Sequence, residues 1–445
     1  MISENQIYRL KCEGINNYGK GVSNVDSFVI FIDDFYTGEI ADIKITKVYK
    51  NFGFGIITNL IQKSPHRIDS LCGHSSLSGT CPFNDITYEY ELKLKSEIVK
   101  HNITRKTSYY KDIECISSED IKGYRNKITV FFNEINGKIK YGYFKEKSND
   151  FIEVDYCVQI DDEINKLLKH IIKILEESNS SIANIRKKVG HIKGVVIRKS
   201  SYTKKIIIMF LSTHNIPNID FIKDNLLSFN KNISGISINI NKSYDTFIYS
   251  GKIIKVYGDS YIDEKIMDII FRVDNLSFLQ VNTSCASLLY KYAIDKANLT
   301  KDDNVLDLYC GVGGITLNLS KYVDKVYGIE EVESSISLAK YNAKSNLISN
   351  SIFYASDSKN FDLFIKKGEI DVLFLDPPRK GLSKELIDKI LFYKFNKIIY
   401  ISCDPYTLSN DLNLLEKEYK IESIKCFNMF PRTRHVETVC CLVKR

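Results

Sequence analysis

The sequence predicts an α/β fold in which a parallel-rich sheet with helices on both faces follows a small N-terminal β-barrel and a central α+β unit. After Phe278, strand-like, loop and helix-like segments alternate along the chain. This alternation is typical of βαβ units, which build a parallel sheet. From Ile7 to about Ile61, short β-rich runs instead alternate with Gly, Asn and Asp turns, which is typical of a small closed barrel.

Composition narrows the class of protein. The 445 residues are 44% hydrophobic, which is enough for several globular domains. Lys and Arg number 62 against 55 Asp and Glu, and the resulting net charge of +7 suits a polyanionic partner such as nucleic acid. The eleven cysteines are scattered behind a polar N-terminus, so we expect a cytoplasmic protein with reduced thiols. No run approaches the roughly 20 apolar residues of a membrane helix, and nothing indicates an obligate protein partner.

Four segments follow from these patterns. Residues 1–61 form the predicted small closed barrel. Residues 62–90 contain Pro, Gly, Ser and two cysteines with little periodicity, so we interpret them as a connecting loop. Residues 91–272 mix β-rich runs with an amphipathic helix near residues 163–178, which predicts an α+β domain. Residues 273–445 carry the strand and helix alternation.

A glycine-rich turn separates a strand-like run from a helix in VLDLYCGVGGITLNL, Val305 to Leu319. Glycines let the backbone approach a ligand closely there, and the helix N-terminus adds N–H donors. Glu330 ends the next strand, where a carboxylate would meet the paired hydroxyls of a ribose. Asp357 ends a third strand, where it would accept from an adenine amine. Because nothing nearby provides a pyrophosphate cradle, S-adenosylmethionine fits this adenosine site better than NAD.

Two further strand ends supply reactive groups. Asp376 ends the strand in VLFLDPPRKGL, and Cys403 ends the strand in YISCDP. A thiol at the ligand-binding edge of such a sheet is a candidate nucleophile, and its addition to C6 of uracil makes C5 reactive enough to take a methyl group. A base must then remove the C5 proton. Glu437, before a C-terminal β run, is the candidate for this base, and His435 is its rival.

Five motifs together carry a resemblance to a known family. They are FLQVN (Phe278 to Asn282), DLYCGVGG, LDPPRKG, ISCDP and HVETV, in this order along the chain. The chain resembles the S-adenosylmethionine-dependent RNA uracil-5-methyltransferases, which modify ribosomal RNA and the T-loop of tRNA. The resemblance covers essentially the whole chain and is strongest from Phe278 to Arg445.

The resemblance implies a Rossmann-like class I methyltransferase domain and a role for each matched residue. Cys403 would be the nucleophile and Glu437 the proton acceptor. S-adenosylmethionine would be held by Gln280, Tyr309, Glu330, Asp357 and Asp376. The N-terminal barrel resembles the TRAM domain, an RNA-binding module that the ribosomal RNA branch carries and the T-loop branch typically lacks. The expected substrate is therefore 23S ribosomal RNA.

The chain departs from the family in the connecting loop. Members of the ribosomal RNA branch often hold an iron-sulfur cluster, and the matching positions here read Cys72, Ser78, Cys81 and Cys157. Serine is a poor ligand for a soft cluster. The sequence therefore favours a loop that has lost its cluster over a site of three thiolates, with Cys115 as an alternative fourth ligand. We expect no other metal site.

Other functions stay open at this point. The alternatives are a tRNA T-loop uridine methyltransferase, an amino-group methyltransferase of the same fold, and a non-catalytic RNA-binding assembly protein. The resemblance implies that the central domain, residues 91–272, binds RNA. Its segment GYRNKITVFF resembles a Tyr-Arg segment of the family, which implies that Arg125 touches a uracil turned out of the RNA.

Overall fold

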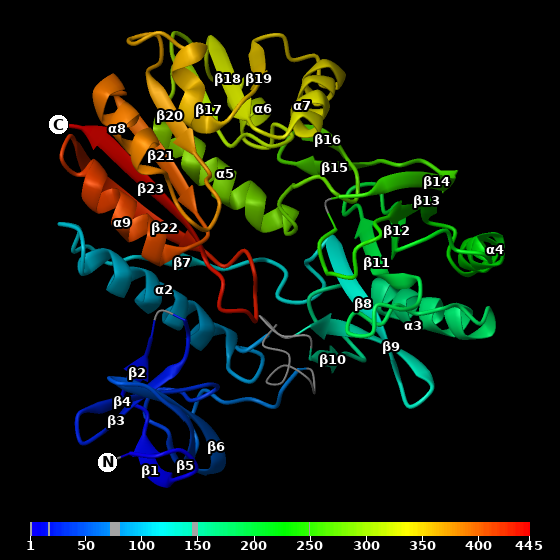
Figure 1. Cartoon of the computed structure of the whole chain (residues 1–445). Helices are drawn as coiled ribbons and strands as arrows, with labels where there is room; N and C mark the ends of the chain where they lie inside the picture. Colours follow the sequence, from blue (N-terminus) through cyan, green and yellow to red (C-terminus); the bar gives the residue numbers. More distant parts are fainter. Residues whose placement is uncertain (1, 17, 72–80, 145–149, 249) are drawn as a thin grey trace. The chain divides into compact units, whose positions relative to one another are not determined.

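Two units make up the part of the chain that the computed structural model describes, which is residues 2–16, 18–71, 81–144, 150–248 and 250–445 (Figure 1). The first unit combines Met1–Ser118 with Asp376–Arg445, and the second is Glu119–Leu375. None of the helices in these described ranges has the length and apolar character that crossing a membrane requires.

The N-terminal barrel of the first unit is a six-stranded sheet with the order β1-β5-β6-β4-β3-β2. Its strands are β1 (Ile7–Lys11), β2 (Gly14–Ile15), β3 (Gly21–Val25), β4 (Phe28–Ile32), β5 (Ile40–Val48) and β6 (Phe52–Gln62). Strands β1 and β3 also contact each other, so the sheet curls back on itself. The core inside it includes the fully buried Ile30, Ile43 and Ile45. The predicted N-terminal barrel is therefore confirmed.

The rest of the first unit contains strands in the order β21-β23-β22-β7. They are β7 (Cys115–Ile116), β21 (Lys397–Ser402), β22 (Tyr419–Phe427) and β23 (Glu437–Lys444). Strand β23 is antiparallel to both of its neighbours, whereas β22 and β7 are parallel. Helix α9 (Pro405–Leu415) packs against α8 (Lys384–Tyr393) and α2 (Tyr88–Thr104). Residues 91–118 of the predicted central segment thus lie in one unit with the C-terminal strands.

A buried ion cluster joins α2 to the loop between β22 and β23. Glu91 and Lys95 lie one turn apart on α2, both have fully buried side chains, and their charged atoms are 3.0 Å apart. Lys95 donates to Asn428 Oδ1 at 2.6 Å and to the Phe430 carbonyl at 3.0 Å. Glu91 accepts from the Asn428 amide at 2.8 Å and from the Arg432 backbone N–H at 2.9 Å. Each buried charge therefore has several partners, as burial of an ion requires.

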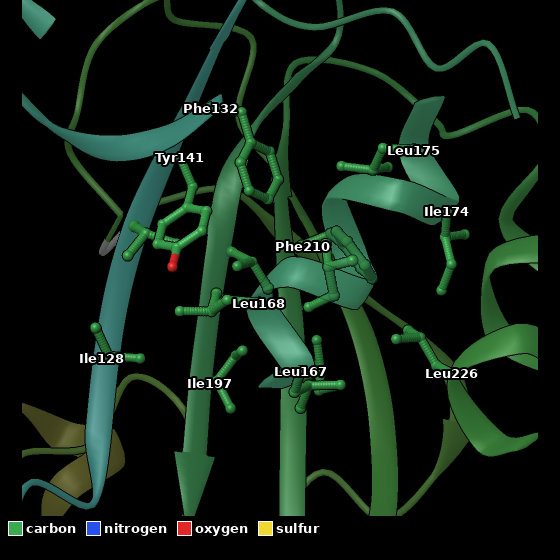
Figure 2. Close-up of a cluster of buried hydrophobic side chains, with 14 of the residues drawn as sticks. Ile128, Phe132, Tyr141, Leu167, Leu168, Ile174, Leu175, Ile197, Phe210 and Leu226 are labelled. Carbon is green, nitrogen blue, oxygen red and sulfur yellow. The ribbon is translucent and has the colours of Figure 1, made fainter. Parts of the chain in front are cut away.

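The second unit begins with a seven-stranded sheet in the order β10-β9-β8-β11-β12-β13-β14. Its strands are β8 (Lys127–Ile135), β9 (Lys138–Phe144), β10 (Phe151–Glu153), β11 (Ile192–Lys199), β12 (Ile206–Ser212), β13 (Ile233–Ile240) and β14 (Lys252–Gly258). Helices α3 (Asp162–Glu177) and α4 (Ile219–Phe229) cover one face. Figure 2 shows Leu167 and Leu168 of α3 packed against Ile197 and Phe210 of the sheet. Apolar residues recur along α3 at helical spacing, so the predicted amphipathic helix is confirmed.

The second unit continues with a β15–β16 hairpin and then with alternating strands and helices (Figure 1). These elements are β15 (Ile262–Ile266), β16 (Ile269–Val273), α5 (Thr283–Ala297), β17 (Asn304–Leu308), α6 (Thr316–Leu319), β18 (Lys325–Glu330), α7 (Glu333–Ser345), β19 (Ser351–Ala355), the 3₁₀ helix η1 (Ser358–Leu363) and β20 (Val372–Leu375). The strands β19, β18, β17 and β20 are neighbours in this order, and every pair among them is parallel. The predicted α/β alternation is therefore confirmed.

We expect Lys95→Met to lower the free energy of unfolding by about 3–5 kcal/mol, because it leaves the Glu91 carboxylate buried without its cation. The chain has no tryptophan, so circular dichroism during denaturation is the suitable measurement. The matched control is Lys93→Met on the same helix, because Lys93 is 64% exposed and pairs with Glu97 at the surface. This control should change stability by less than about 1 kcal/mol. Equal losses in both variants would contradict the structural role of the cluster.

Candidate active site

Two adjacent strands bring Cys403 and Glu437 together. Strand β21 is antiparallel to β23, and Ser402 pairs with Thr438 at the end of their ladder. Continuing this register by one residue places Cys403 opposite Glu437. On its other side Glu437 pairs with Phe427, which fixes it at the first position of β23. The predicted nucleophile and the predicted base are therefore neighbours.

The turn after β21 fixes the direction in which the chain leaves Cys403. Asp404 is the N-cap of α9, and its carboxylate accepts from the backbone N–H groups of Tyr406 and Thr407 at 2.8 and 3.1 Å. Pro405 takes the first helical position, where a missing N–H removes no intrahelical hydrogen bond. The partly exposed thiol thus lies on a short, hydrogen-bonded turn.

Burial controls the acidity of the groups at this site. Glu437 is 4% exposed, and its burial raises the pKa of its carboxyl to about 8, an effect that Asp376 increases and Arg379 opposes. Loss of solvent also raises the pKa of Asp376 to about 7. Burial, with the charges of Glu437 and Asp376, raises the pKa of the Cys403 thiol to about 12. Burial at this site therefore disfavours the charged form of all three groups.

Arg379 is the cation of the site, and we did not predict it. Its only sequence signal is its position directly after Asp-Pro-Pro. Its guanidinium Nη2 lies 3.2 Å from either ring nitrogen of the exposed His435. Its backbone carbonyl accepts from Thr407 Oγ1 at 3.0 Å, and the Asp411 carboxylate accepts from the Leu382 N–H at 2.9 Å. Helix α9 therefore holds the loop that carries Arg379.

In the second unit, a glycine turn follows strand β17. Tyr309, Gly311 and Gly313 have positive φ angles of 69°, 54° and 88°, so the chain turns sharply before α6. A Cβ atom on Gly311 would meet no atom within 4 Å, which means that space is open beside this backbone. The Gly311 N–H donates to Glu330 Oε2 at 3.3 Å. Open backbone beside a strand-end carboxylate is what an adenosine ligand needs.

Gln280 lies close to the same glycine turn. Its neighbour Leu279 would be 3.8 Å from a Cβ atom on Gly314, the last glycine of the turn. Gln280 is 4% exposed, and the Asn126 side chain donates to its backbone carbonyl at 3.4 Å. The segment before α5 is therefore packed against the turn, as a cofactor role for Gln280 requires.

Asp357 lies at the next strand end. Glu330 of β18 pairs with Ala355 of β19, and Asp357 follows two residues later. Its carboxylate caps η1 by accepting from the Lys359 N–H at 3.0 Å. The remaining predicted cofactor residue, Asp376, follows β20 directly along the chain and belongs to the first unit.

The cysteines of the predicted cluster motif are only partly described. Cys72 and Ser78 lie outside the described residues. Cys81 is buried in the first unit, Cys157 belongs to the apolar core of the second, and Cys115 pairs with Cys426 between β7 and β22. The described residues contain no group of three metal-binding side chains. Retention or loss of a cluster stays a prediction.

Two protein-family models match this chain, one over the N-terminal barrel and the other over most of the remaining residues. The family model described as tRNA (uracil-5-)-methyltransferase matches residues 87–445, and the model of the TRAM domain matches residues 3–58. A protein of Clostridium acetobutylicum described as an uncharacterized RNA methyltransferase is 34% identical over 452 residues, which covers 100% of this chain and 98% of that protein. A similarly described protein of Oceanobacillus iheyensis is 32% identical and covers 98% and 96%.

A solved structure with a similar fold is the tRNA (uracil-54, C5)-methyltransferase of Pyrococcus abyssi in complex with S-adenosyl-L-homocysteine. Its sequence is 25% identical, the TM-score is 0.79, and the match covers 98% of this chain and 100% of that one. The fold class predicted from the sequence, a class I methyltransferase domain with a TRAM barrel and a central α+β domain, is therefore confirmed.

We expect the stability of Glu437→Gln to depend less on pH than that of the parent protein. A carboxyl whose folded pKa is raised from 4.5 to about 8 stabilises the fold while it is protonated, and this contribution is lost as the pH rises through about 8. Glutamine stays neutral at every pH. The variant should therefore gain stability relative to the parent as the pH rises from 4.5 to about 8. Denaturation followed by circular dichroism across this range measures the difference.

The matched control for this measurement is Glu385→Gln on α8, where the glutamate is 57% exposed and pairs with Lys389 at the surface. Its stability should follow the parent at every pH. If the stability of Glu437→Gln and that of the parent changed with pH in the same way, the pKa of Glu437 would not be raised in the folded protein.

Proposed function

We propose that this chain, which belongs to the tRNA (uracil-5-)-methyltransferase family, transfers a methyl group from S-adenosylmethionine to C5 of a uridine in 23S ribosomal RNA. The observation that supports this reaction best is the pairing of β21 with β23, which puts a thiol beside a buried carboxyl group. Methylation of uracil at C5 needs this combination, because one group must add to C6 and another must remove the C5 proton.

Cys403 is the proposed nucleophile. Its sulfur forms a bond to C6 of the uracil, and the electrons of the C5–C6 double bond move toward C5 and the C4 carbonyl. The carbon at C5 then resembles an enolate and is reactive enough to accept a methyl group. Burial raises the thiol pKa to about 12, so the Cys403 proton must pass to a base as the sulfur adds to C6. We assign this proton to the Asp376 carboxylate, whose charge acts on the thiol, and it returns to the sulfur when the thiolate leaves.

Glu437 is the proposed base for the C5 proton. Once C5 carries both its hydrogen and the new methyl group, loss of that proton restores the double bond and expels the Cys403 sulfur. Glu437 is buried beside Cys403, whereas the rival His435 is exposed and directed at Arg379. Only the ionised carboxylate can accept a proton, and the Arg379 cation lowers the Glu437 pKa toward the neutral range.

S-adenosylmethionine supplies an electrophilic methyl group on a sulfonium centre when it is bound. We assign its contacts in the second unit to Gln280, Tyr309, Glu330 and Asp357, which lie around one glycine turn. The Glu330 carboxylate is placed to accept from ribose hydroxyls, and the open backbone at Gly311 leaves room for the ligand. Asp376, which directly follows β20 in the chain, is the remaining residue for which the family resemblance implies cofactor binding.

The RNA is proposed to bind the TRAM barrel through aromatic rings and lysines. Tyr49 is 42% exposed and stacks on Phe52 with ring centroids 4.9 Å apart. Phe54 lies edge-on to both rings, and the Lys47 ammonium lies 5.2 Å from the Tyr49 centroid. Exposed rings beside cations are the usual means of holding single-stranded RNA without reading its sequence.

A tRNA substrate is the second candidate, and one observation favours it. The match to the Pyrococcus abyssi tRNA (uracil-54, C5)-methyltransferase covers 98% of this chain, which includes the barrel segment. The barrel therefore does not separate the two substrates by itself. We keep 23S ribosomal RNA as the proposed substrate because the cysteine positions Cys72, Cys81 and Cys157 resemble the cluster motif of the ribosomal RNA branch. A cytoplasmic location stays a prediction.

We expect cells that lack this protein to lose 5-methyluridine from 23S ribosomal RNA and to keep it in the tRNA T-loop. Mass mapping of both RNAs measures this loss. Restoring the parent protein should restore the modification, whereas Cys403→Ala should restore none, because the proposed nucleophile is then missing. The matched control is Cys115→Ala, since Cys115 is also a partly exposed cysteine in the same unit.

Cys115→Ala should restore the modification to the level of the parent protein. A loss of 5-methyluridine confined to the tRNA T-loop would identify tRNA as the substrate instead of 23S ribosomal RNA. Full modification with Cys403→Ala would refute the thiol mechanism and favour an amino-group target, while unchanged RNA in the deletion strain would favour the non-catalytic assembly protein.

A further inference from the structure

A cleft of about 660 Å³ opens within the second unit, and none of the residues assigned to catalysis or cofactor binding lines it. Its walls are residues 120–126, the start of α3, residues 199–204, the β15–β16 turn and the start of α5. A volume of this size is in the range of small-molecule and nucleotide sites.

The cleft is strongly basic. Its lining contains five cationic side chains and two carboxylates, which gives a net charge of +3 (five minus two). The cations are Lys122, Arg125, Lys199, Lys204 and Lys265, and the acids are Asp120 and Asp161. A concave surface with this excess of positive charge attracts polyanions.

Two of the cations, Lys199 and Arg125, are fixed by contacts with other residues, and the other three are exposed. Lys199 pairs with Asp161 and Glu163, and Arg125 donates to Gln159 Oε1 at 2.9 Å and to the Lys127 carbonyl. These two therefore shape the cleft. Arg125, which we expected to touch the substrate uracil, lies in this wall.

Lys204 and Lys265 form the exposed group, together with Lys122. The Lys204 ammonium donates to the Ser201 carbonyl at 2.6 Å, and Lys265 lies above the Tyr202 ring, 5.8 Å from its centroid. A flexible lysine that is bound only to a carbonyl or a ring can turn toward a phosphate at small cost.

Helix α5 adds donors on the opposite wall. Its 15 residues start at Thr283, and the N-cap Asn282 accepts from the Cys285 N–H at 3.2 Å. Thr283 and Ser284 both line the cleft. The start of a helix of this length carries partial positive charge and free N–H groups, which complement a phosphate.

Tyr202 supplies a surface for a base. Its side chain is 49% exposed at the rim of the cleft. An exposed ring beside cations is suited to stack on a nucleobase while the cations bind the adjoining phosphate. Free phosphate would use the cations alone, so the ring favours a nucleic acid strand.

We propose that this cleft binds a short single-stranded segment of the substrate RNA, through its phosphodiesters and one base stacked on Tyr202. This inference rests on the proposed function and adds a second contact for the same RNA. The cleft wall and the cofactor segment are continuous, because the backbone N–H of Asn126, a wall residue, donates to the Val281 carbonyl at 2.9 Å. Val281 directly follows Gln280 in the chain.

The test measures binding of a fluorescein-labelled decamer of uridylate to the full-length protein by anisotropy at several salt concentrations. Replacing both exposed lysines, Lys204→Gln and Lys265→Gln, should weaken binding about tenfold or more and reduce the slope of log K against log salt by about 0.7 for each lost phosphate contact. Tyr202→Ala should weaken binding about fivefold or more with an unchanged salt slope.

The matched control replaces two exposed lysines outside the cleft, Lys173→Gln and Lys252→Gln, which gives the same change in net charge. Its affinity should stay within about twofold of the parent if the cleft lysines make local phosphate contacts. Equal weakening in the control and in the cleft variant would overturn the inference, because net charge alone would then explain the effect. Unchanged affinity in the cleft variant would also overturn it.

Two further measurements distinguish failure of the cleft inference from failure of the proposed function. Uridine 5′-monophosphate should compete with the decamer only weakly, and competition at the affinity of the decamer would make the cleft a free-nucleotide site instead. Cys403→Ala protein should bind the decamer as the parent does. If the cleft variant binds normally while Cys403→Ala abolishes methylation, the cleft inference fails and the proposed function stands.

Discussion

The buried ion cluster on helix α2 is the constraint on which the first unit depends. Glu91 and Lys95 have no exposed side-chain surface, and their partners lie in the loop between β22 and β23, more than 300 positions away in the chain. Leaving one of these charges without its partner inside the protein would cost several kcal/mol, so the loop has one low-energy position. The loop ends where Glu437 begins β23. The contacts of this loop with α2 therefore help to set where the chain enters β23 at the proposed base.

The same loop also contacts the barrel. Arg434 pairs with Asp33 at 2.8 Å, and its side chain packs so closely on Gly19 that a Cβ atom there would lie 3.0 Å from it. The RNA-binding barrel and the proposed catalytic strand are thus attached to one short segment of the first unit. Around Cys403, burial raises the pKa of the thiol to about 12 and the pKa values of Glu437 and Asp376 to about 8 and about 7. We infer that substrate binding, which changes the solvation of all three groups, starts the proton transfers.

Local sequence patterns predicted the positions of strands and helices better than they predicted the long-range contacts between them. The glycine turn after β17, the cysteine directly after β21 and the glutamate at the start of β23 lie where strand-end reasoning put them. Their placement could be predicted because strand and helix periodicity is a local property. Arg379 carried no such signal, since its role comes from the fold of the loop after it. The packing of α2 on α9, and the pairing of β7 with β22, could not be predicted either, because the segments are joined only through contacts distant in sequence.

The central claim is that Cys403 bonds to C6 of a uracil in RNA and that loss of the C5 proton releases it. The most direct measurement uses 23S ribosomal RNA transcribed with 5-fluorouridine, incubated with the protein and S-adenosylmethionine and then digested for peptide mass mapping. Fluorine at C5 cannot be removed as a proton, so the sulfur cannot leave. The account predicts a methylated RNA fragment attached to the peptide that contains Cys403. Attachment to another residue, or methylated RNA released without any adduct, would contradict it.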